Sequence, residues 1–391
     1  MADKMRIDQL VGEHAEMLSS RLRAHREALF PPDASKELRR FTSGEAAKLI
    51  GVKDAYLRQL SLEGKGPMPE LSPSGRRSYS PHDILALRHF LEKGAKTPGT
   101  YLPGRRDGDP VQVISVINFK GGSGKTTTSA HLAQKAALDG YRVLAVDLDP
   151  QASLSALHGF QPEFDLLDGG TLYDAIRYDD PCPTADIVRQ SYFPGLSIIP
   201  GNLDLMEFEH ETPAAIARRG EIFFTRVGEA LSQVSDDFDI IIMDCPPQLG
   251  FLTMSALSAA TAVLVTVHPQ MLDVMSMCQF LLMTSELLGV VANAGGDMSY
   301  DWMRYVVTRY EPGDGPQNQM VSFMRSMFGD YVLNHPVLKS TAITDAGITK
   351  QTLYEVDKSQ FTRATFERAI ESVNNVNNEI LDLVQHAWGR S

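Results

Sequence analysis

The stretch Lys120-Gly121-Gly122-Ser123-Gly124-Lys125-Thr126-Thr127 follows the apolar run 111–119 and opens a segment of helical character. A strand that feeds a glycine-rich loop into a helix N-terminus makes a phosphate cradle, because backbone N–H groups converge on an anion and the helix end carries partial positive charge. In this pattern Lys125 reaches the β- and γ-phosphates, and the Thr126 hydroxyl binds Mg²⁺. The sequence therefore predicts that residues 120–127 bind a nucleoside triphosphate.

The loop departs from the usual P-loop pattern at two positions. Phe119 stands where the pattern has its first glycine, and an additional lysine, Lys120, precedes the glycine pair. This is the deviant Walker A form. A glycine-rich turn with a surface lysine is the alternative, but strand, glycines, lysine and threonine all occur at the spacing that phosphate binding needs.

The composition is that of a globular protein with two or three domains. The chain has 391 residues, of which 22% are charged and 43% hydrophobic. No apolar run approaches the roughly 20 residues needed to span a bilayer, and the first ten residues lack the apolar centre of a signal peptide. We therefore expect a cytoplasmic protein that does not insert into a membrane. Each of the three cysteines (Cys182, Cys245 and Cys278) is expected to be a small buried apolar residue.

The charge is distributed unevenly along the chain. Residues 1–107 hold 19 Lys and Arg against 14 Asp and Glu, whereas the remainder holds 18 against 35. A positive balance near the N-terminus fits contact with nucleic acid, although a solvated helical face would explain it equally well. The pattern predicts a helical N-terminal segment over 1–40, with the helix ended by Pro31-Pro32. A partner subunit or a neighbouring domain would cover its apolar stripe, and dimerisation is the expected case. The pattern further predicts a compact unit over 41–96, a turn-rich linker over 97–110 and an α/β domain over 111–391.

The compact unit reads as a DNA-binding domain. Residues 42–52 are typical of the first helix and tight turn of a helix-turn-helix, with a Ser/Thr cap and a glutamate close behind it. The recognition helix would be 53–62, and residues 75–84 resemble the wing and next helix of MerR-type winged domains. The expected DNA contacts are Lys53, Tyr56, Arg58 and Gln59 in the major groove and Arg76 and Arg77 on phosphate. A small helical bundle used only for packing is the alternative.

From residue 111 onward apolar strands alternate with helices. Strands are expected within 111–119, 141–149, 196–201, 239–247, 261–269 and 305–310, and helices after the P-loop, near 215–234 and over about 273–289. This alternation indicates a mostly parallel sheet that is covered by helices on both faces, as in P-loop NTPases.

Three carboxylates are expected at the same edge of that sheet as the phosphate loop. Asp147 and Asp149 follow one buried strand, and Asp244 ends another. The carboxyl ends of parallel strands are where ligands bind in such folds. Carboxylates placed there hold Mg²⁺ through water and orient an attacking water molecule.

Taken together, the deviant Walker A loop, the motif Asp147-Leu148-Asp149-Pro150-Gln151 and the motif Asp244-Cys245-Pro246-Pro247 resemble the ParA/MinD family of P-loop ATPases over roughly 111–368. With the N-terminal helix and helix-turn-helix, the chain is similar to the large ParA proteins of plasmid partition systems; the RepA partition proteins of repABC plasmids are the nearest such group. The resemblance implies that Lys120 reaches across a nucleotide-sandwich homodimer to the other subunit's phosphates. It also implies that Asp149 positions the attacking water, and that Asp147 and Asp244 act around Mg²⁺.

The resemblance also implies a slow ATPase whose cycle switches dimerisation and DNA affinity, and a centromere-binding partner of the ParB/RepB type that stimulates hydrolysis. The resemblance further implies that the protein represses its own operon and is associated with the nucleoid in the cytoplasm. Nonspecific DNA binding near the C-terminus would use Lys339, Lys350, Arg363 and Arg368. Residues 302–391 nevertheless carry 9 Lys and Arg against 10 Asp and Glu, so they contain no basic block.

Other readings remain open. A metabolic ligase such as a dethiobiotin synthetase-like enzyme shares the phosphate loop but does not normally carry a helix-turn-helix. A nitrogenase-reductase-like electron carrier needs two cysteines that share an iron–sulfur cluster, and a MinD-like membrane switch needs a basic amphipathic C-terminal helix, whereas residues 377–388 are acidic. An ATP-regulated transcriptional repressor without a partition role is the main alternative of a different class.

Overall fold

The structure is a computed structural model that describes residues 6–29, 38–73, 75–161, 165–166, 169–220 and 222–390. The chain divides into two compact units, residues 1–37 and 38–391. The described part of the first unit is the helix α1 (Ile7–Leu29), whose exposed apolar residues include Ile7, Val11, Met17 and Leu18. The expected helix end at Pro31-Pro32 lies outside the described residues.

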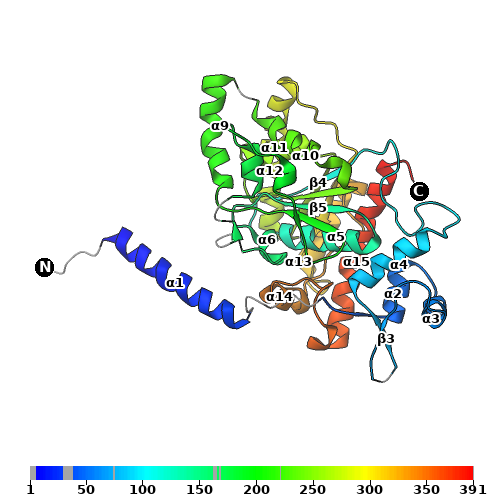
Figure 1. The fold of residues 1–391 in the computed structure, drawn as a ribbon. Coiled ribbons are helices and arrows are strands. Elements are labelled where there is room, and N and C mark those ends of the chain that lie inside the picture. The colour runs from blue at the N-terminus through cyan, green and yellow to red at the C-terminus, as the bar shows by residue number, and fades with distance from the viewer. Residues whose placement is uncertain are drawn as a thin grey trace. The chain divides into compact units, whose positions relative to one another are not determined.

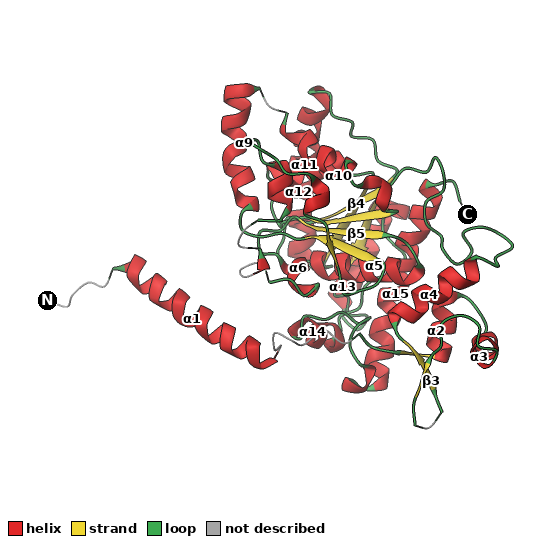
Figure 2. Cartoon of the chain, in the orientation of Figure 1, coloured by secondary structure: helices red, strands yellow, loops and turns green. Residues whose placement is uncertain are grey.

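The second unit is built on a seven-stranded sheet with the order β10-β9-β4-β8-β5-β7-β6 (Figure 2). Its strands are β4 (Gln112–Ile117), β5 (Val143–Asp147), β6 (Arg189–Gln190), β7 (Leu196–Ile199), β8 (Ile240–Asp244), β9 (Ala262–Val267) and β10 (Trp302–Val307). All neighbouring pairs are parallel except β6 with β7. The predicted parallel sheet is confirmed. The two-residue edge strand β6 was not expected, because Arg189–Gln190 carries no apolar pattern.

Helices cover both faces of the sheet (Figure 1). Alternate residues of the central strand β4 enter different cores, with Ile114 and Val116 in one and Val113 and Ile117 in the other. The first core also contains residues of α5 (Lys125–Asp139) and α15 (Arg363–Ala387). The second contains residues of α8 (Leu172–Ile176), α9 (Leu205–Arg219), α10 (Arg226–Ser232), α11 (Phe251–Ala259), α12 (Met271–Asn293) and α13 (Gly315–Phe328).

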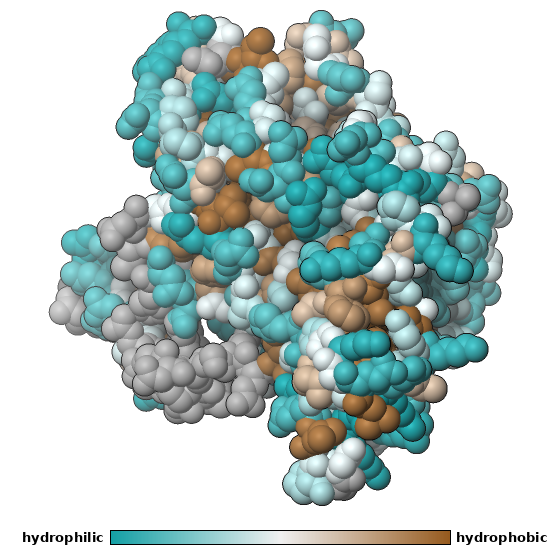
Figure 3. Space-filling model, turned by 45° about the vertical axis from the view of Figure 1, so that its right-hand side comes forward, coloured by the Kyte–Doolittle hydropathy of each residue, from teal (hydrophilic) through white to brown (hydrophobic). Residues whose placement is uncertain are grey.

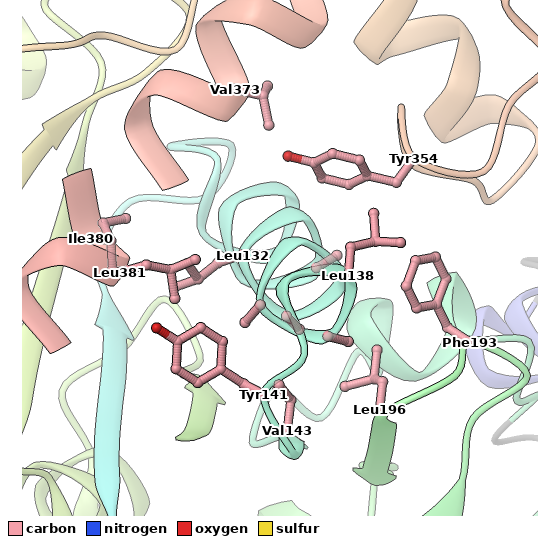
Figure 4. Packing of buried hydrophobic residues seen from close by; sticks show 14 of the residues in the cluster. Leu132, Leu138, Tyr141, Val143, Phe193, Leu196, Tyr354, Val373, Ile380 and Leu381 are labelled. Carbon is pink, nitrogen blue, oxygen red and sulfur yellow. The ribbon is translucent and has the colours of Figure 1, made fainter. Parts of the chain in front are cut away.

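The helix that follows the glycine-rich loop lies in the middle of the first core. In Figure 4, Leu132 and Leu138 of α5 point toward side chains that come from distant segments, among them Tyr354, Ile380 and Leu381. Helices α6 (Ser153–Leu157) and α14 (Thr341–Ile348) also belong to this part of the chain, with 3₁₀ turns at Thr184–Asp186, Phe223–Thr225, Ser235–Asp237, Gly329–Tyr331 and Lys358–Gln360.

The prediction of a single helix near 215–234 is wrong, because this region contains the end of one helix, α9, and all of another, α10. Gly220 adopts the left-handed conformation (φ 65°) and its N–H caps α9 on the carbonyl of Ile216. A left-handed C-cap of this kind ends a helix. The sequence also hid the true start of α9, because Pro213 lies inside the helix, where proline is unfavourable.

Helix α12 is longer and more apolar than we expected from the sequence. Its most apolar window has a mean hydropathy of 1.6, and by length and composition it passes the test for a membrane span, contrary to expectation. This is weak evidence, because core helices of other proteins pass the same test. Its buried residues Met277, Phe280 and Val291 pack in the second core. Cys278 lies on its exposed side, so the expectation that each cysteine is buried is wrong for Cys278; Cys182 is half-buried and Cys245 buried.

The segment before the ATPase-like sheet contains three helices and a small sheet. These elements are β1 (Phe41–Thr42), α2 (Ser43–Ile50), α3 (Asp54–Leu62), β2 (Glu70–Leu71), β3 (Arg77–Tyr79) and α4 (Pro81–Glu92). Thr42 caps α2 in a capping box with Glu45, and Gly51 makes the left-handed turn (φ 83°) toward α3. The strands pair antiparallel in the order β1-β3-β2.

A buried arginine joins this segment to the large sheet's helices. The Arg88 guanidinium of α4 donates to the carbonyl oxygens of Leu138 (2.7 Å), Tyr101 (3.0 Å) and Leu49 (2.6 Å) and pairs with Asp139 at 3.2 Å. Only 4% of Arg88 is exposed. Because Leu138 and Asp139 end α5, the guanidinium holds α4 against the far end of the helix that begins at the glycine-rich loop.

We expect Arg88→Ala to destabilise the folded chain by about 3 kcal/mol, because it removes the donor of the buried Leu138 carbonyl and of the half-buried carbonyls of Tyr101 and Leu49. Urea unfolding followed by tryptophan fluorescence measures the change. The exposed Arg76→Ala serves as the matched control and should shift stability by less than about 0.5 kcal/mol. Equal effects of the two substitutions would show that Arg88 is not a structural link.

Candidate functional site

The glycine-rich loop lies at the carboxyl end of the central strand β4, as the sequence predicts, and leads directly into α5. Gly122 (φ 76°) and Gly124 (φ 91°) adopt left-handed conformations that favour glycine. Gly124 is the N-cap of α5, which begins at Lys125. The loop backbone therefore opens on a helix N-terminus, the arrangement that binds anions.

Side chains from two neighbouring strands fix the loop in place. The Thr308 hydroxyl donates to the backbone oxygen of Ser123 (2.6 Å), and the Thr266 hydroxyl donates to Ser123 Oγ (3.0 Å). Arg309, which has a left-handed backbone (φ 53°), donates to the carbonyl of Gly122 at 3.1 Å. Sequence reasoning missed these three residues. They follow or end β9 and β10, and only the strand order reveals that these ends lie beside the loop.

Lys125 is buried at the start of α5. Its Nζ donates to the backbone oxygen of Lys120 at 3.4 Å. Burial lowers the pKa of Lys125, while the nearby charges of Asp244 and Asp149 act in the opposite direction. A buried ammonium at a helix N-terminus is stabilised by an anion. Thr126 and Thr127, the next residues of the helix, are half-buried beside it.

Asp147 and Asp244 face each other at the ends of the paired strands β5 and β8. Both are fully buried. Asp147 Oδ2 accepts hydrogen bonds from the backbone N–H (2.8 Å) and hydroxyl (2.7 Å) of Ser155. Asp244 Oδ1 accepts from the Ser129 hydroxyl at 3.0 Å, whereas its Oδ2 is buried and accepts no hydrogen bond within the described chain. That oxygen has unused capacity for a cation or a water molecule.

Burial raises the pKa values of both carboxyl groups, and the charge of Asp244 raises that of Asp147 further. The hydroxyls of Thr126 and Ser129 and the charge of Lys125 favour the ionised form of Asp244 and partly offset its burial. Two like charges so close together cannot both ionise easily. A divalent cation beside them would favour ionisation of both.

Asp149 lies nearer to the surface at the same sheet edge. It is half-buried, and its Oδ1 accepts a hydrogen bond from the backbone N–H of Gln151 at 2.9 Å. The structure therefore brings all three predicted carboxylates to the carboxyl ends of β5 and β8, and β8 is the strand beside β4. Within the described ranges, His, Cys, Asp and Glu side chains form no cluster of three that could hold a metal ion alone. A metal here would need ligands from outside that set, such as a hydroxyl, phosphate or water.

Lys120 pairs with a different carboxylate. Its ammonium forms an ion pair with the carboxylate of Asp273, in the first turn of α12. A pocket of about 260 Å³ surrounds this pair and is lined by Asn118, Lys120, Gly121, Gly122, Ser123, His268, Gln270, Asp273 and Arg309. Sequence reasoning missed Asp273, because a lone aspartate near a helix start carries no signal by itself.

The residues expected to contact the DNA major groove lie on the surface of α3 or at its start. Lys53, Tyr56, Arg58 and Gln59 are exposed. Arg58 pairs with Asp54 at 2.5 Å, and Gln59 donates to Glu63 at 2.7 Å, both within the same helix. Arg76 is exposed beside β3, whereas Arg77 is half-buried and its Nε donates to the Ser61 hydroxyl at 3.2 Å.

Two of the four basic residues expected to contact DNA near the C-terminus form ion pairs with acids. Lys339 pairs with Glu311 (2.8 Å), and Arg363 pairs with Glu367 (2.7 Å). Arg368 is exposed on α15, and Lys350 is half-buried with a left-handed backbone (φ 54°). In Figure 3 hydrophilic residues cover most of the visible face, with separate apolar patches among them.

Several known proteins are similar to this chain in sequence and in fold. A family model described as an AAA domain matches residues 111–291. A protein named replication protein A from Rhizobium rhizogenes is 56% identical over 97% of this chain and 95% of its own length. Protein SopA of Escherichia coli K12 is 31% identical over 91% of this chain and 92% of its own.

Solved structures extend the likeness to the fold. A partition protein superimposes with a TM-score of 0.68 at 17% identity and covers 98% of this chain and 100% of its own. Cobyrinic acid a,c-diamide synthase of Mycobacterium smegmatis, solved with an ATP analogue and magnesium, gives a TM-score of 0.51 at 26% identity and covers 61% of this chain and 91% of its own. The long matches to the two bacterial relatives, and the loop with its three carboxylates, establish the identity: the chain belongs to the ParA family of P-loop partition ATPases.

Proposed function

We propose that this protein hydrolyses ATP with Mg²⁺ and uses the nucleotide cycle to partition plasmid DNA. One observation carries the proposal: the buried Lys125 of the glycine-rich loop lies within range of the charge of Asp244, whose buried Oδ2 accepts no hydrogen bond in the described chain. An anion and a cation that arrive together would satisfy both groups. A Mg²⁺–triphosphate complex has this composition.

The triphosphate would lie on residues 121–127. The loop N–H groups and the α5 N-terminus would contact phosphate oxygens, and Lys125 would offset the charge of the β- and γ-phosphates. Support comes from the lowered pKa of Lys125, since a buried lysine regains its preference for the charged form when an anion binds. The related synthase of M. smegmatis, solved with an ATP analogue and magnesium, supports the same choice of ligand.

Thr126, Asp147 and Asp244 would hold the magnesium, Asp147 and Asp244 through water. The unpartnered Oδ2 of Asp244 and the polar donor set fit a hard divalent cation. When bound, Mg²⁺ neutralises charge on the phosphates during transfer. Asp149, which is half-buried and nearer to solvent, would orient the attacking water, and Lys120 would neutralise phosphate charge across a homodimer.

We expect Asp149→Ala to bind ATP within about twofold of the wild type but to lose turnover by at least about 100-fold, because the carboxylate orients water and does not hold phosphate. The variant should accumulate as an ATP-bound dimer. Nucleotide titration, phosphate release and sedimentation measure the three effects. The exposed Asp107→Ala is the control and should turn over normally. Normal turnover in Asp149→Ala would show that another group orients the attacking water. A wild type that does not bind ATP would refute the proposed function.

We expect the benefit of Mg²⁺ for ATP binding to fall by roughly fourfold between pH 7.5 and pH 5.5, because burial raises the pKa of Asp244 to about 6. The sign follows from the raised pKa of Asp244: as the pH falls through that pKa the carboxyl group takes up a proton, which competes with the cation. Titration with and without Mg²⁺ at both pH values measures the benefit. Asp244→Asn cannot titrate, so its smaller benefit should change less with pH. If the benefit of Mg²⁺ changed equally with pH in the wild type and in Asp244→Asn, a group other than Asp244 would be the one that takes up the proton.

The partition role rests on relatives that align along nearly the whole chain, SopA and the replication protein A of R. rhizogenes. In this role the ATP-bound chain forms a homodimer, binds DNA without sequence preference and meets a centromere-binding protein of the ParB/RepB type that stimulates hydrolysis. The protein would work in the cytoplasm, associated with the nucleoid. The N-terminal helix α1, with its exposed apolar residues, would contribute to dimerisation.

The segment 41–96 would act as a winged helix-turn-helix that reads an operator and represses the chain's own operon. Supporting observations are the capped α2, the left-handed turn at Gly51, the exposed polar face of α3 and the hairpin of β2 and β3. Arg58 and Gln59 would exchange their partners on α3 for base edges. An ATP-regulated repressor without partition is the second candidate, favoured by the contact of Arg88 with the end of α5.

We expect the double substitution Arg58→Ala with Gln59→Ala to weaken operator binding by about 1–3 kcal/mol per base contact, and to leave nonspecific DNA binding nearly unchanged. Lys339→Ala with Lys350→Ala should do the reverse and reduce the salt slope by about one unit per phosphate contact. Titrations of both DNA types at two salt concentrations separate these effects. Arg218→Ala on α9 is the control. Parallel losses in both variants would indicate one shared DNA surface.

A further inference from the structure

The signature lysine of the loop is already engaged within its own subunit. The Lys120 ammonium pairs with Asp273, although the loop beside it is built to attract phosphate. The Lys120 side chain is 47% exposed, whereas the Asp273 side chain is 8% exposed. The carboxylate is therefore a fixed, buried acceptor, and the lysine is the partner that can leave.

Two features of its surroundings favour binding of an ammonium group by the Asp273 carboxylate. Its position in the first turn of α12 favours the ionised form, because a helix N-terminus carries partial positive charge. The Nδ1 atom of His268 lies 3.1 Å from Asp273 Oδ2. Burial, and then the positive charges of Arg309, Lys120 and Lys339, lower the pKa of His268 and so favour its neutral form beside the carboxylate.

The backbone of Lys120 is also fixed. Its N–H donates to Asn118 Oδ1 at 2.8 Å, and its carbonyl accepts from Lys125 Nζ. Only the side chain is then available to change partner. Any direct contact between this ammonium and a phosphate, in its own subunit or in a second one, must compete with the ion pair to Asp273.

We propose that Asp273 is a positioning residue that retains Lys120 within its own subunit, so that the lysine crosses to a second ATP-bound copy only when phosphate charge outcompetes the carboxylate. This inference rests on the proposed ATPase function. The pair raises the protein concentration at which ATP-bound dimers form, because each subunit must give up an ion pair before the lysine can cross. An ion pair with one exposed partner contributes roughly threefold, so the two pairs of a dimer together shift the equilibrium by roughly tenfold.

The test compares the full-length wild type with Asp273→Asn and Asp273→Glu by sedimentation, in the presence of Mg²⁺ and a non-hydrolysable ATP analogue. We expect Asp273→Asn to dimerise at a roughly tenfold lower protein concentration, while Asp273→Glu, which keeps the charge, stays near the wild type. Structural damage would weaken dimerisation, so the expected gain separates positioning from damage. Glu286→Gln, an exposed acid on the same helix, is the matched control and should change nothing.

A second measurement examines the nucleotide-free chain. Acylation of lysine side chains, read by mass spectrometry, should modify Lys120 several-fold faster in Asp273→Asn than in the wild type, because its amino group is then no longer held in the ion pair with Asp273. If the amide variant does not fold, Asp273→Ser takes its place in both measurements.

The outcomes are distinct. A wild type that does not bind the ATP analogue would refute the proposed function itself. A wild type that binds and dimerises, with Asp273→Asn dimerising at the same or a higher concentration, would overturn only the role of Asp273. Equal labelling of Lys120 in both proteins would also overturn it, because the ion pair would then not restrain the lysine in solution.

Discussion

The central constraint on this molecule is the burial of two carboxylates side by side. Strand pairing places Asp147 directly opposite Asp244, and the surrounding strands exclude water from both. Such a pair persists only if nearby groups compensate its charge. Ser155 and Ser129 supply hydroxyls, and Lys125 supplies a positive charge. These polar side chains surround one strand pair, and an incoming cation would complete the compensation of its charge.

Helix α5 serves both this site and the stability of the fold. Its first residue is Lys125, and most of its remaining length is buried between the sheet and α15. Small residues such as Ala133 and Ala137 allow that close packing. Because the helix is held along its whole length, its N-terminus stays fixed against the loop, and an anion can bind without ordering the backbone first. Preorganisation of this kind lowers the entropic cost of binding.

The sequence was sufficient for the loop, the parallel strands and the three carboxylates, because each depends on a local pattern. It was insufficient wherever the answer depends on which strands are neighbours. Thr308 supports the loop only because β10 and β9 lie beside β4, and Asp273 meets Lys120 only because α12 begins at that same edge. The break between α9 and α10 was missed for a local reason, since Pro213 resembled a boundary and Gly220 did not.

The connection between the N-terminal helices and the sheet has a geometric consequence. Although residues 97–110 contain no helix or strand, the Glu92 carboxylate accepts the N–H groups of Gly99, Tyr101 and Leu102, and Arg390 pairs with Asp109. These contacts make residues 97–110 a rigid connection and not a flexible linker. In the proposed two-fold dimer, the two α3 helices would be mounted rigidly, with one separation and one relative direction. The spacing between operator half-sites would then be set by the angle at which the two ATPase folds meet.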